Sequence, residues 1–473
     1  MNIIHVTSEV LPFSNNSSMA ETLFCLPFAT KRAGHEVSVF SPLYTSIDVA
    51  KHNIKSTQLK TWVNAGFAVY EFEIFETYLN DVRYVFFKND ELFNRAGLYG
   101  MGTFDYADND IRFGTFSQAA LNFLKYHNID VDILHCHNWQ TALIPVYKKL
   151  YFDDLNCKTI LTIHSVDNLG VFNKFTIEAL NLPWDIYNME NIEYYDNISF
   201  LKGGIVFADA ITTLSPAFAK ELVQNGGGIG VEEIFTNHTN KLEGILNGIC
   251  SMIWNPQEDT NIPAHFSKDD ISGKNVCKNS LCSELGLDPS LPLVVFIQKL
   301  TPERGLDLII NAVDEFVSNK INLIIFGQNQ TSNYNQKFQE IKDKYSSHVK
   351  VIISDHANKS QAEYAAADIV LMPSMYEPCG SSILIGMRYG AIPVVRKTGG
   401  LIDGSKTAVE KGVGFSFDEF KSEAMIKAVQ KAAELVLSPK RDEVIKTLLE
   451  IDNSWQNATK DYLKLYKRLL EGK

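Results

Sequence analysis

The chain has 473 residues, of which 45% are hydrophobic and 21% are charged, and its formal net charge is −12 at pH 7. This length exceeds what one hydrophobic core usually holds and predicts two domains of a soluble globular protein. The acidic balance argues against proteins that bind nucleic acid or anionic membranes, because both need a basic face. We expect no signal peptide, since Met1–Val6 already has the pattern of a strand, and no apolar run is long enough to span a bilayer. The seven cysteines show no clustered spacing, so we expect reduced thiols in a cytoplasmic enzyme.

The N-terminal half alternates strand-like and helix-like segments. Segments 67–75 and 82–87 alternate in polarity like a hairpin or a sheet extension, and further strands are predicted over 2–8, 34–40, 131–136 and 158–163. Strands that alternate with helices predict a doubly wound parallel sheet. The first strand is not followed by Gly-x-Gly-x-x-Gly, so the fingerprint of a nicotinamide enzyme is absent where it should stand.

Three histidines lie at or near strand ends in this half. His135 and His137 share one face of their strand, but no third and fourth ligand stands at usable spacing for zinc, so we expect no metal site. His164 follows the strand at 158–163, and strand ends in open α/β sheets face the ligand crevice. A lone histidine is more often structural, and it is the position of His164 that favours a role in binding.

The C-terminal half repeats the alternation and predicts a second parallel sheet. Lys299 and Arg304 stand in the turn between a strand and a helix expected over 306–317. Two cations at such a turn form either an anion site or a solvated basic pair. Strands are predicted over 293–298, 321–326, 349–354 and 368–372, and later helices begin near Ser422 and Asp442.

The stretch 373–390 carries the strongest functional pattern. Its loop, 377–382, follows a buried strand and ends where a helix begins, and that helix stops at Gly390. Backbone N–H groups at a helix start lack partners within the helix and lie at the positive end of its dipole, so they can hold a diphosphate without a metal. Glu377, just before this point, can bind a sugar hydroxyl or face a developing positive charge. The alternative is an ordinary strand–loop–helix connection with a solvated glutamate.

The residues Glu-Pro-Cys-Gly at 377–380 resemble a motif of ADP-glucose-dependent glycogen and starch synthases, and so does the segment 396–403. The family's loop S-E-x-x-P-F-x-K-x-G-G-L-A-D keeps its frame here at Ser8, Glu9, Pro12, Phe13 and Ala20, and the similarity extends over nearly the whole chain. The resemblance implies an α/β chain with two doubly wound Rossmann-like domains facing a cleft, the GT-B architecture. It implies an acceptor-side N-terminal domain at 1–249, a donor-side C-terminal domain at 250–452, and a final helix at 453–473 that crosses back to the first domain.

The resemblance also implies a retaining glucosyltransferase. It would move glucose from ADP-glucose, or another nucleoside diphosphate glucose, to the 4-hydroxyl end of an α-1,4-glucan, without a metal or another cofactor. Glu377 and His164 would hold the sugar, while Lys299 and Arg304 would neutralise the diphosphate, although the family has these two cations in the opposite order. The remaining residues expected at the nucleotide sugar are Cys379, Gly380, Ser381, Ser382, Thr398, Gly399 and Asn15.

Several positions depart from the family. Asn15 stands where the family has a lysine, so a positive charge for phosphate is missing, and Asp355 stands where an aromatic residue often lies near the adenine. The other departures are Ser17 and Ser18 for a glycine pair, Glu21 and Asn138 for aspartate and Ser165 for asparagine. This loss, concentrated in the N-terminal half, leaves an alternative open: a weakly active or inactive glucan-binding, regulatory paralogue. The glycine-rich run 226–230 is expected to be a mobile loop.

Overall fold

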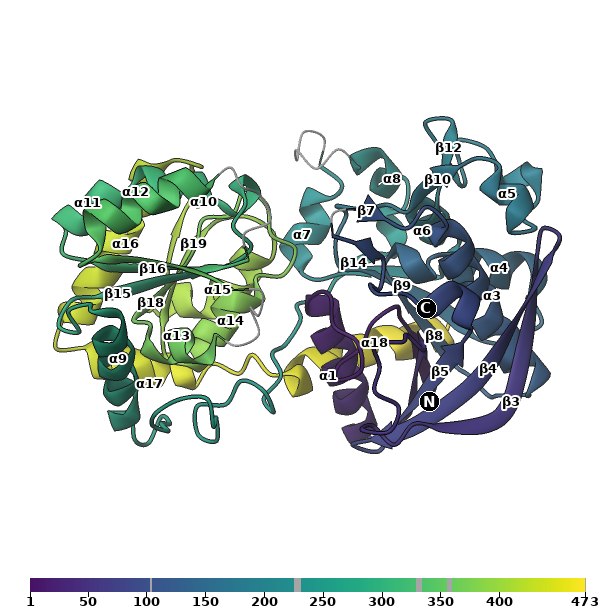
Figure 1. The fold of residues 1–473 in the computed structure, drawn as a ribbon, viewed down its shortest axis with the longest axis horizontal. Coiled ribbons are helices and arrows are strands. Elements are labelled where there is room, and N and C mark those ends of the chain that lie inside the picture. Colours follow the sequence, from purple (N-terminus) through teal and green to yellow (C-terminus); the bar gives the residue numbers. More distant parts are fainter. Residues whose placement is uncertain (103, 225–230, 329–333, 355–359, 473) are drawn as a thin grey trace. The chain divides into compact units, whose positions relative to one another are not determined.

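The structure is a computed structural model that describes residues 1–102, 104–224, 231–328, 334–354 and 360–472 (Figure 1). The glycine-rich run 226–230 and Asp355 lie outside the described residues. The chain forms two compact units. Unit 1 comprises Met1–Leu214, Ala219–Ile245 and Ala458–Lys473, and unit 2 comprises Ser215–Phe218 and Leu246–Asn457.

Unit 1 is built on a nine-stranded sheet with the order β14-β13-β9-β8-β1-β2-β5-β4-β3. The seven strands from β14 to β5 are parallel, and β4 and β3 extend the sheet as an antiparallel pair. The strands are β1 (Asn2–Val6), β2 (Glu36–Pro42), β3 (Lys55–Ala65), β4 (Ala68–Leu79), β5 (Val82–Lys88), β8 (Ile133–His137), β9 (Lys158–Ile163), β13 (Ala210–Thr213) and β14 (Leu242–Gly244). The predicted hairpin of β4 and β5 is confirmed, whereas β3 escaped prediction because only three of its eleven residues are buried.

Helices and short strands complete this unit. Two small sheets also occur, β10 (Val171–Asn173) with β11 (Glu193–Tyr194) and β12 (Asn197–Ser199), and β6 (Gly100–Met101) with β7 (Phe104–Asp105). The helices wholly in unit 1 are α1 (Ser18–Arg32), α2 (Asp90–Phe93), α3 (Asn109–Tyr126), α4 (Leu143–Tyr151), α5 (Thr176–Ala179), α6 (Phe200–Phe207) and α8 (Glu232–Thr236). Two more, α7 (Pro216–Glu221) and α18 (Trp455–Leu470), begin in residues of unit 2 and continue into unit 1.

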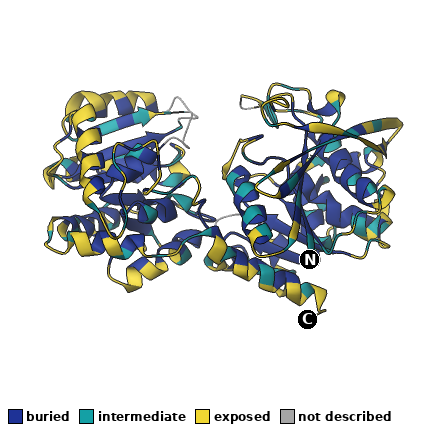
Figure 2. Ribbon diagram, turned by 90° about the horizontal axis from the view of Figure 1, so that it is seen from below, coloured by how far each residue is buried: buried dark blue, intermediate teal, exposed yellow. Residues whose placement is uncertain are grey.

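The last helix, α18, returns to unit 1 from residue 458 onward. Its buried side chains recur at helical spacing and form one apolar stripe, which lies opposite the exposed face seen in Figure 2. The stripe consists of Trp455, Thr459, Tyr462, Leu465 and Tyr466. Tyr466 shares a hydrogen bond with His135 of β8 at 2.8 Å, so the helix contacts the centre of the sheet.

Unit 2 contains a six-stranded sheet, entirely parallel, with the order β17-β16-β15-β18-β19-β20. The strands are β15 (Leu293–Ile297), β16 (Asn322–Gly327), β17 (Val349–Ile353), β18 (Ile369–Met372), β19 (Ile392–Arg396) and β20 (Phe415–Phe417). All residues of β15, β16 and β18 are buried, as expected of strands covered by helices on both faces. The predicted pair of parallel, doubly wound sheets is therefore confirmed.

The helices of unit 2 follow its strands in alternation. They are α9 (Ser272–Leu285), α10 (Leu306–Asn311), α11 (Val313–Ser318), α12 (Asn335–Tyr345), α13 (Gln361–Ala366), α14 (Ser381–Arg388), α15 (Gly399–Glu410), α16 (Ser422–Leu437) and α17 (Arg441–Leu449). The single helix predicted over 306–317 was wrong: it is interrupted at Ala312, whose backbone N–H donates to the Ile309 carbonyl in a turn of four residues.

Two passages of unit 2 lie side by side near its ends. The amide of Ile249, where the sequence predicted the domain boundary, donates to the Asn453 carbonyl at 2.9 Å, and Ile249 bridges to Ser454 in parallel. A Cβ atom on Gly248 would stand 2.4 Å from the Trp455 nitrogen, so this close approach requires glycine. Among the described residues, no helix combines the length and the apolar composition that a membrane span requires.

Candidate active site

In unit 2, three loops leave the sheet where its strand order reverses. The chain builds from β15 toward β16 and β17, and then returns to the other side of β15 with β18, β19 and β20. Such a reversal is the usual ligand site of an open α/β sheet, at the carboxyl ends of the strands. The loops after β15, β18 and β19 carry Lys299, Arg304, Glu377, Cys379, Gly380 and Thr398. The fold thus brings the predicted residues of this half to one sheet edge.

Glu377 is buried, with 8% of its surface exposed, and forms an ion pair with Arg304. The Arg304 Nη1 donates to the Glu377 Oε2 at 2.6 Å and to the Tyr376 carbonyl at 3.3 Å, and its guanidinium lies over the Tyr376 ring. The hydroxyl of Ser374 donates to the same carboxylate oxygen at 3.4 Å. The sequence predicted each of these two charges separately, and their pairing is a new observation that joins the loops after β15 and β18.

Lys299 differs from Arg304 in its surroundings. Its side chain is exposed, and no carboxylate of the described chain lies within ion-pair distance of it. The two predicted cations are therefore not equivalent, because one is held by a buried carboxylate and the other projects into solvent from the same loop.

Two helices begin beside Glu377, and neither has a side-chain cap on its first turn. Helix α14 starts after Gly380, whose φ of 77° is left-handed and favours glycine, and α15 starts after Thr398. The backbone N–H of Gly400 donates to the Glu377 carbonyl at 2.8 Å, and a Cβ atom on Gly400 would lie 2.2 Å from the Cys379 carbonyl oxygen. The two helix N-termini therefore meet at the loop 377–380, and their dipoles place positive potential there.

The other predicted residues of unit 2 support these turns. Ser382 donates through its hydroxyl to the Ile297 carbonyl at 3.1 Å, which ties the start of α14 to the end of β15. Thr398 is buried and donates to the Met375 carbonyl at 3.4 Å. Ser381 is the first residue of α14 and Gly399 the first residue of α15, while Cys379 is buried two residues before α14 begins.

Unit 1 has its own reversal of strand order, between β1 and β8. The chain goes from β1 to β2 in one direction and from β8 to β9, β13 and β14 in the other. Parallel pairing sets His5 of β1 opposite His135 of β8. His164 follows β9 directly, so the fold brings the predicted binding histidine to the same sheet edge.

A third histidine, His5, completes a buried group with His135 and His137, and their nitrogen atoms lie within 4.8 Å of one another. The expectation that no third ligand stood nearby was wrong, because spacing along the chain does not show which strands become neighbours. Most of the ring nitrogens nevertheless hold hydrogen bonds: His5 Nδ1 to His137 Nε2 at 3.2 Å, and His135 to the hydroxyls of Tyr466 and Thr162. The rings of His135 and His137 are also stacked, at 4.3 Å between centroids, which turns faces rather than lone pairs toward each other.

Burial determines the charge of these histidines. It lowers the pKa of His5 and that of His164 to about 3, and it holds the pKa values of His135 and His137 well below the usual range. All four imidazoles are therefore neutral at neutral pH.

The loop after β1 is held by Glu9, which is 1% exposed. The Glu9 carboxylate accepts hydrogen bonds from the Asn16 and Ser17 amides, at 2.5 and 3.0 Å, and from the Ser17 hydroxyl at 2.6 Å. Burial raises the pKa of Glu9, although these hydrogen bonds oppose the shift. Ser17 also caps α1 by accepting from the Met19 amide at 3.2 Å. Asn15 is exposed, and this loop offers no cation at its position.

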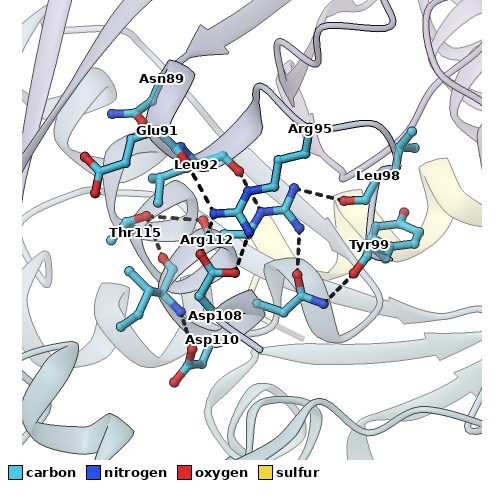
Figure 3. A network of polar contacts seen from close by, with 12 residues as sticks. Asn89, Glu91, Leu92, Arg95, Leu98, Tyr99, Asp108, Asp110, Arg112 and Thr115 are labelled. Atoms are coloured by element: carbon cyan, nitrogen blue, oxygen red, sulfur yellow. Dashed lines mark hydrogen bonds and ion pairs between the residues drawn. The ribbon is translucent and has the colours of Figure 1, made fainter. Parts of the chain in front are cut away.

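The buried residue Arg112 escaped notice in the sequence. Its guanidinium donates to the carbonyls of Leu92 and Leu98 at 2.7 and 3.0 Å and to the Asn109 side chain at 2.6 Å (Figure 3). Asn109 donates in turn to the Tyr99 carbonyl, and the Tyr99 hydroxyl shares a hydrogen bond with the Ser8 hydroxyl at 2.7 Å. The network thus connects the segment 92–109 to the loop after β1. No short motif signals an arginine of this kind.

Comparison with known proteins matches two family models. "Starch synthase catalytic domain" covers residues 2–237, and "Glycosyl transferases group 1" covers residues 281–447. The glycogen synthase of Aquifex aeolicus is 36% identical over 470 residues, which is 99% of both chains, and that of Syntrophotalea carbinolica is 34% identical over 481 residues, with 100% and 99% covered. Among solved structures, the catalytic domain of starch synthase IV from Arabidopsis thaliana, bound to ADP and acarbose, superposes with a TM-score of 0.90 at 28% identity over 99% of both chains. A sucrose-phosphate synthase from Thermosynechococcus elongatus, at 14% identity and a TM-score of 0.58, shares the fold.

Proposed function

Because this chain belongs to the glycogen and starch synthase family and is a glucosyltransferase of that type, we propose that it transfers glucose from ADP-glucose to the 4-hydroxyl end of an α-1,4-glucan. The observation that supports this most is the edge of the unit 2 sheet, where two helix N-termini begin beside Glu377 and two cations follow β15. A sugar nucleotide needs this combination of anion binding and a carboxylate for the sugar. The match to a starch synthase structure with bound ADP agrees with an adenine nucleotide as donor.

The charges at this edge suit a leaving diphosphate. When the bond between glucose and diphosphate breaks, negative charge grows on the departing oxygen and positive charge on the sugar ring. Lys299, Arg304 and the amides at the start of α14 stabilise the oxygen, and no metal is required for this electrostatic role. Glu377 holds the sugar and faces its developing positive charge.

The Arg304 guanidinium can pair with the Glu377 carboxylate or with the diphosphate of the donor. It holds the Glu377 carboxylate, and a planar guanidinium binds phosphate oxygens with the same geometry, so a bound diphosphate can take Arg304 from the carboxylate. Lys299 is exposed and needs no such exchange. We therefore assign Lys299 to first capture of the diphosphate, and Arg304 to a position that couples the diphosphate to Glu377.

In unit 1, His164 contacts the donor sugar, and the loop after β1 contributes hydrogen bonds without a cation. All seven cysteines are buried free thiols, which agrees with a cytoplasmic location. No comparison favours the inactive paralogue that the substitutions in this loop had left open.

The test is incorporation of labelled glucose into glycogen from ADP-glucose and from UDP-glucose, measured separately. We expect incorporation from ADP-glucose and its loss in Glu377→Ala. Incorporation from neither donor, together with retained binding of maltooligosaccharides, would show instead a glucan-binding paralogue. Faster transfer from UDP-glucose would overturn the donor assignment alone.

A further inference from the structure

Three histidines of unit 1 form one continuous hydrogen-bonded chain. His5 Nδ1 contacts His137 Nε2 at 3.2 Å, and His137 Nδ1 contacts His164 Nε2 at 3.0 Å. His5 and His137 have no exposed surface, and His164 has 7% exposed. The chain therefore runs from the sheet interior to the residue that we place at the donor sugar. His135, on the same strand as His137, stands outside it, because its nitrogens bond to hydroxyl groups.

A chain of neutral imidazoles has a direction. Each neutral ring carries one N–H and one lone pair, so a ring that is bonded at both nitrogens donates from one and accepts at the other. His137 is such a ring, and its orientation therefore sets both neighbours. Only two arrangements satisfy both hydrogen bonds: one in which every N–H points toward His164, and one in which every N–H points toward His5.

The interior end of the chain distinguishes the two. The Nε2 atom of His5 is buried and has no hydrogen-bond partner among the described residues. If the N–H groups pointed toward His5, this atom would be a buried donor without an acceptor, which is rare in folded proteins. With the opposite direction it is an unused lone pair, and the N–H at the other end of the chain is the Nδ1–H of His164. No partner for that Nδ1 lies within the described part of the chain.

We propose that His5 and His137 are positioning residues that hold His164 in its Nδ1–H form, so that His164 donates a hydrogen bond to a hydroxyl oxygen of the donor sugar. The tautomer follows from the hydrogen-bond chain alone, and only its use toward the sugar rests on the proposed function. A sugar hydroxyl that accepts from His164 keeps its own proton for another acceptor. The free histidine side chain favours the other tautomer, so the fold has to impose this one.

The tautomer is measured by long-range ¹H–¹⁵N correlation spectra of protein labelled in its 11 histidines, with the signals of His164 assigned from their absence in His164→Ala. We expect a protonated Nδ1 and an unprotonated Nε2 on His164 in the wild type. The same result is expected in His135→Phe, the matched control, which removes an equally buried imidazole from the same strand without interrupting the chain. In His137→Phe the preference for Nδ1–H should disappear. An Nε2–H form in the wild type, or an unchanged His164 in His137→Phe, would refute the proposal.

Kinetics then test the use of the tautomer. We expect kcat/KM for ADP-glucose to fall about tenfold in His137→Phe, the order of one hydrogen bond, and to stay near the wild-type value in His135→Phe. If His164→Ala transfers glucose as fast as the wild type, the role of His164 at the sugar fails while the tautomer assignment stands. If His137→Phe does not fold, His137→Leu, a smaller apolar side chain that also removes the link to His164, replaces it in both measurements.

Discussion

The ion pair of Arg304 and Glu377 predicts that removing the charge of Glu377 strengthens nucleotide binding and weakens glucose transfer. If Arg304 leaves the carboxylate to bind the diphosphate, Glu377→Gln removes a competitor, so ADP should bind more tightly while glucose transfer falls. At the observed 2.6 Å, Coulomb attraction with an effective dielectric constant of 20 is about 6 kcal/mol. Desolvation offsets most of this attraction, and a hydrogen bond to a charged group contributes about 1.5–3 kcal/mol net. Release of Arg304 should therefore raise ADP affinity by about 10- to 100-fold.

The assay is calorimetric titration of ADP into the wild type, Glu377→Gln and Glu303→Gln. Glu303 is the matched control, because it is an exposed carboxylate in the same loop as Arg304, and its replacement changes the net charge equally. We expect Glu303→Gln to bind ADP only slightly more tightly, because an exposed negative charge is screened by solvent and salt. Arg304→Met should bind ADP more weakly than the wild type. Equal affinity in the wild type and Glu377→Gln would refute the exchange and would leave Arg304 as a residue that only positions Glu377.

Three further predictions concern the loop after β1, the start of α14 and a buried lysine. Asn15→Lys should strengthen binding of ADP-glucose by up to about fivefold, as expected of an exposed charge pair. An unchanged Kd in calorimetry would show that the lack of a cation at position 15 does not weaken donor binding. Gly380→Ala should lower the free energy of unfolding by more than the about 1–3 kcal/mol of a strained backbone, because its Cβ would lie 2.5 Å from a Leu401 methyl group, and it should also slow transfer. The control is Gly412→Ala, which has a φ of 71° and open space around it and therefore measures the cost of backbone strain alone. Equal losses of stability of the two variants in urea unfolding would contradict the clash with Leu401. Burial lowers the pKa of Lys274 from its ordinary value of 10.5 to about 7. Between these two pH values the unfolded chain binds one proton that the folded protein does not bind. The free energy of unfolding that depends on Lys274 therefore rises with pH through this window. Lys274→Met also removes hydrogen bonds to the Tyr364 and Tyr389 carbonyls, so the prediction concerns the pH dependence: its effect on the free energy of unfolding should be more favourable at pH 6.5 than at pH 9. Equal effects in urea unfolding at the two pH values would exclude this linkage.

The sequence predicted the two parallel sheets because their central strands are short apolar runs between helical segments. It also singled out the loops after β15 and β18, because Lys299 and Glu377 stand within five residues of the ends of these runs. It missed β3, whose largely exposed surface leaves little hydrophobic signal, and it missed Arg112, whose partners are mainly backbone carbonyls.

The spacing of residues along the chain does not predict which distant strands become neighbours in the sheet. His5 stands 130 residues before His135, and only the parallel register of β1 and β8 makes them neighbours. The pairing of Arg304 with Glu377 joins two loops in the same way. The sequence therefore predicted the charged residues themselves, while their pairing followed from the order of the strands.

The changes in the loop after β1 differ in whether the structure compensates for them. Ser17 replaces a glycine, yet its hydroxyl donates to Glu9 and caps α1, so the turn keeps its hydrogen bonds. Asn15 replaces a lysine, and no nearby substitution in this loop returns the lost charge. Under the proposed function, unit 2 neutralises the diphosphate, because Lys299 has no carboxylate partner within the described residues and Arg304 presents a fork where the resemblance predicts a single ammonium. A guanidinium binds carboxylate and phosphate oxygens with the same planar geometry and can exchange one for the other, so an arginine at this position is consistent with the loss at Asn15 rather than independent of it.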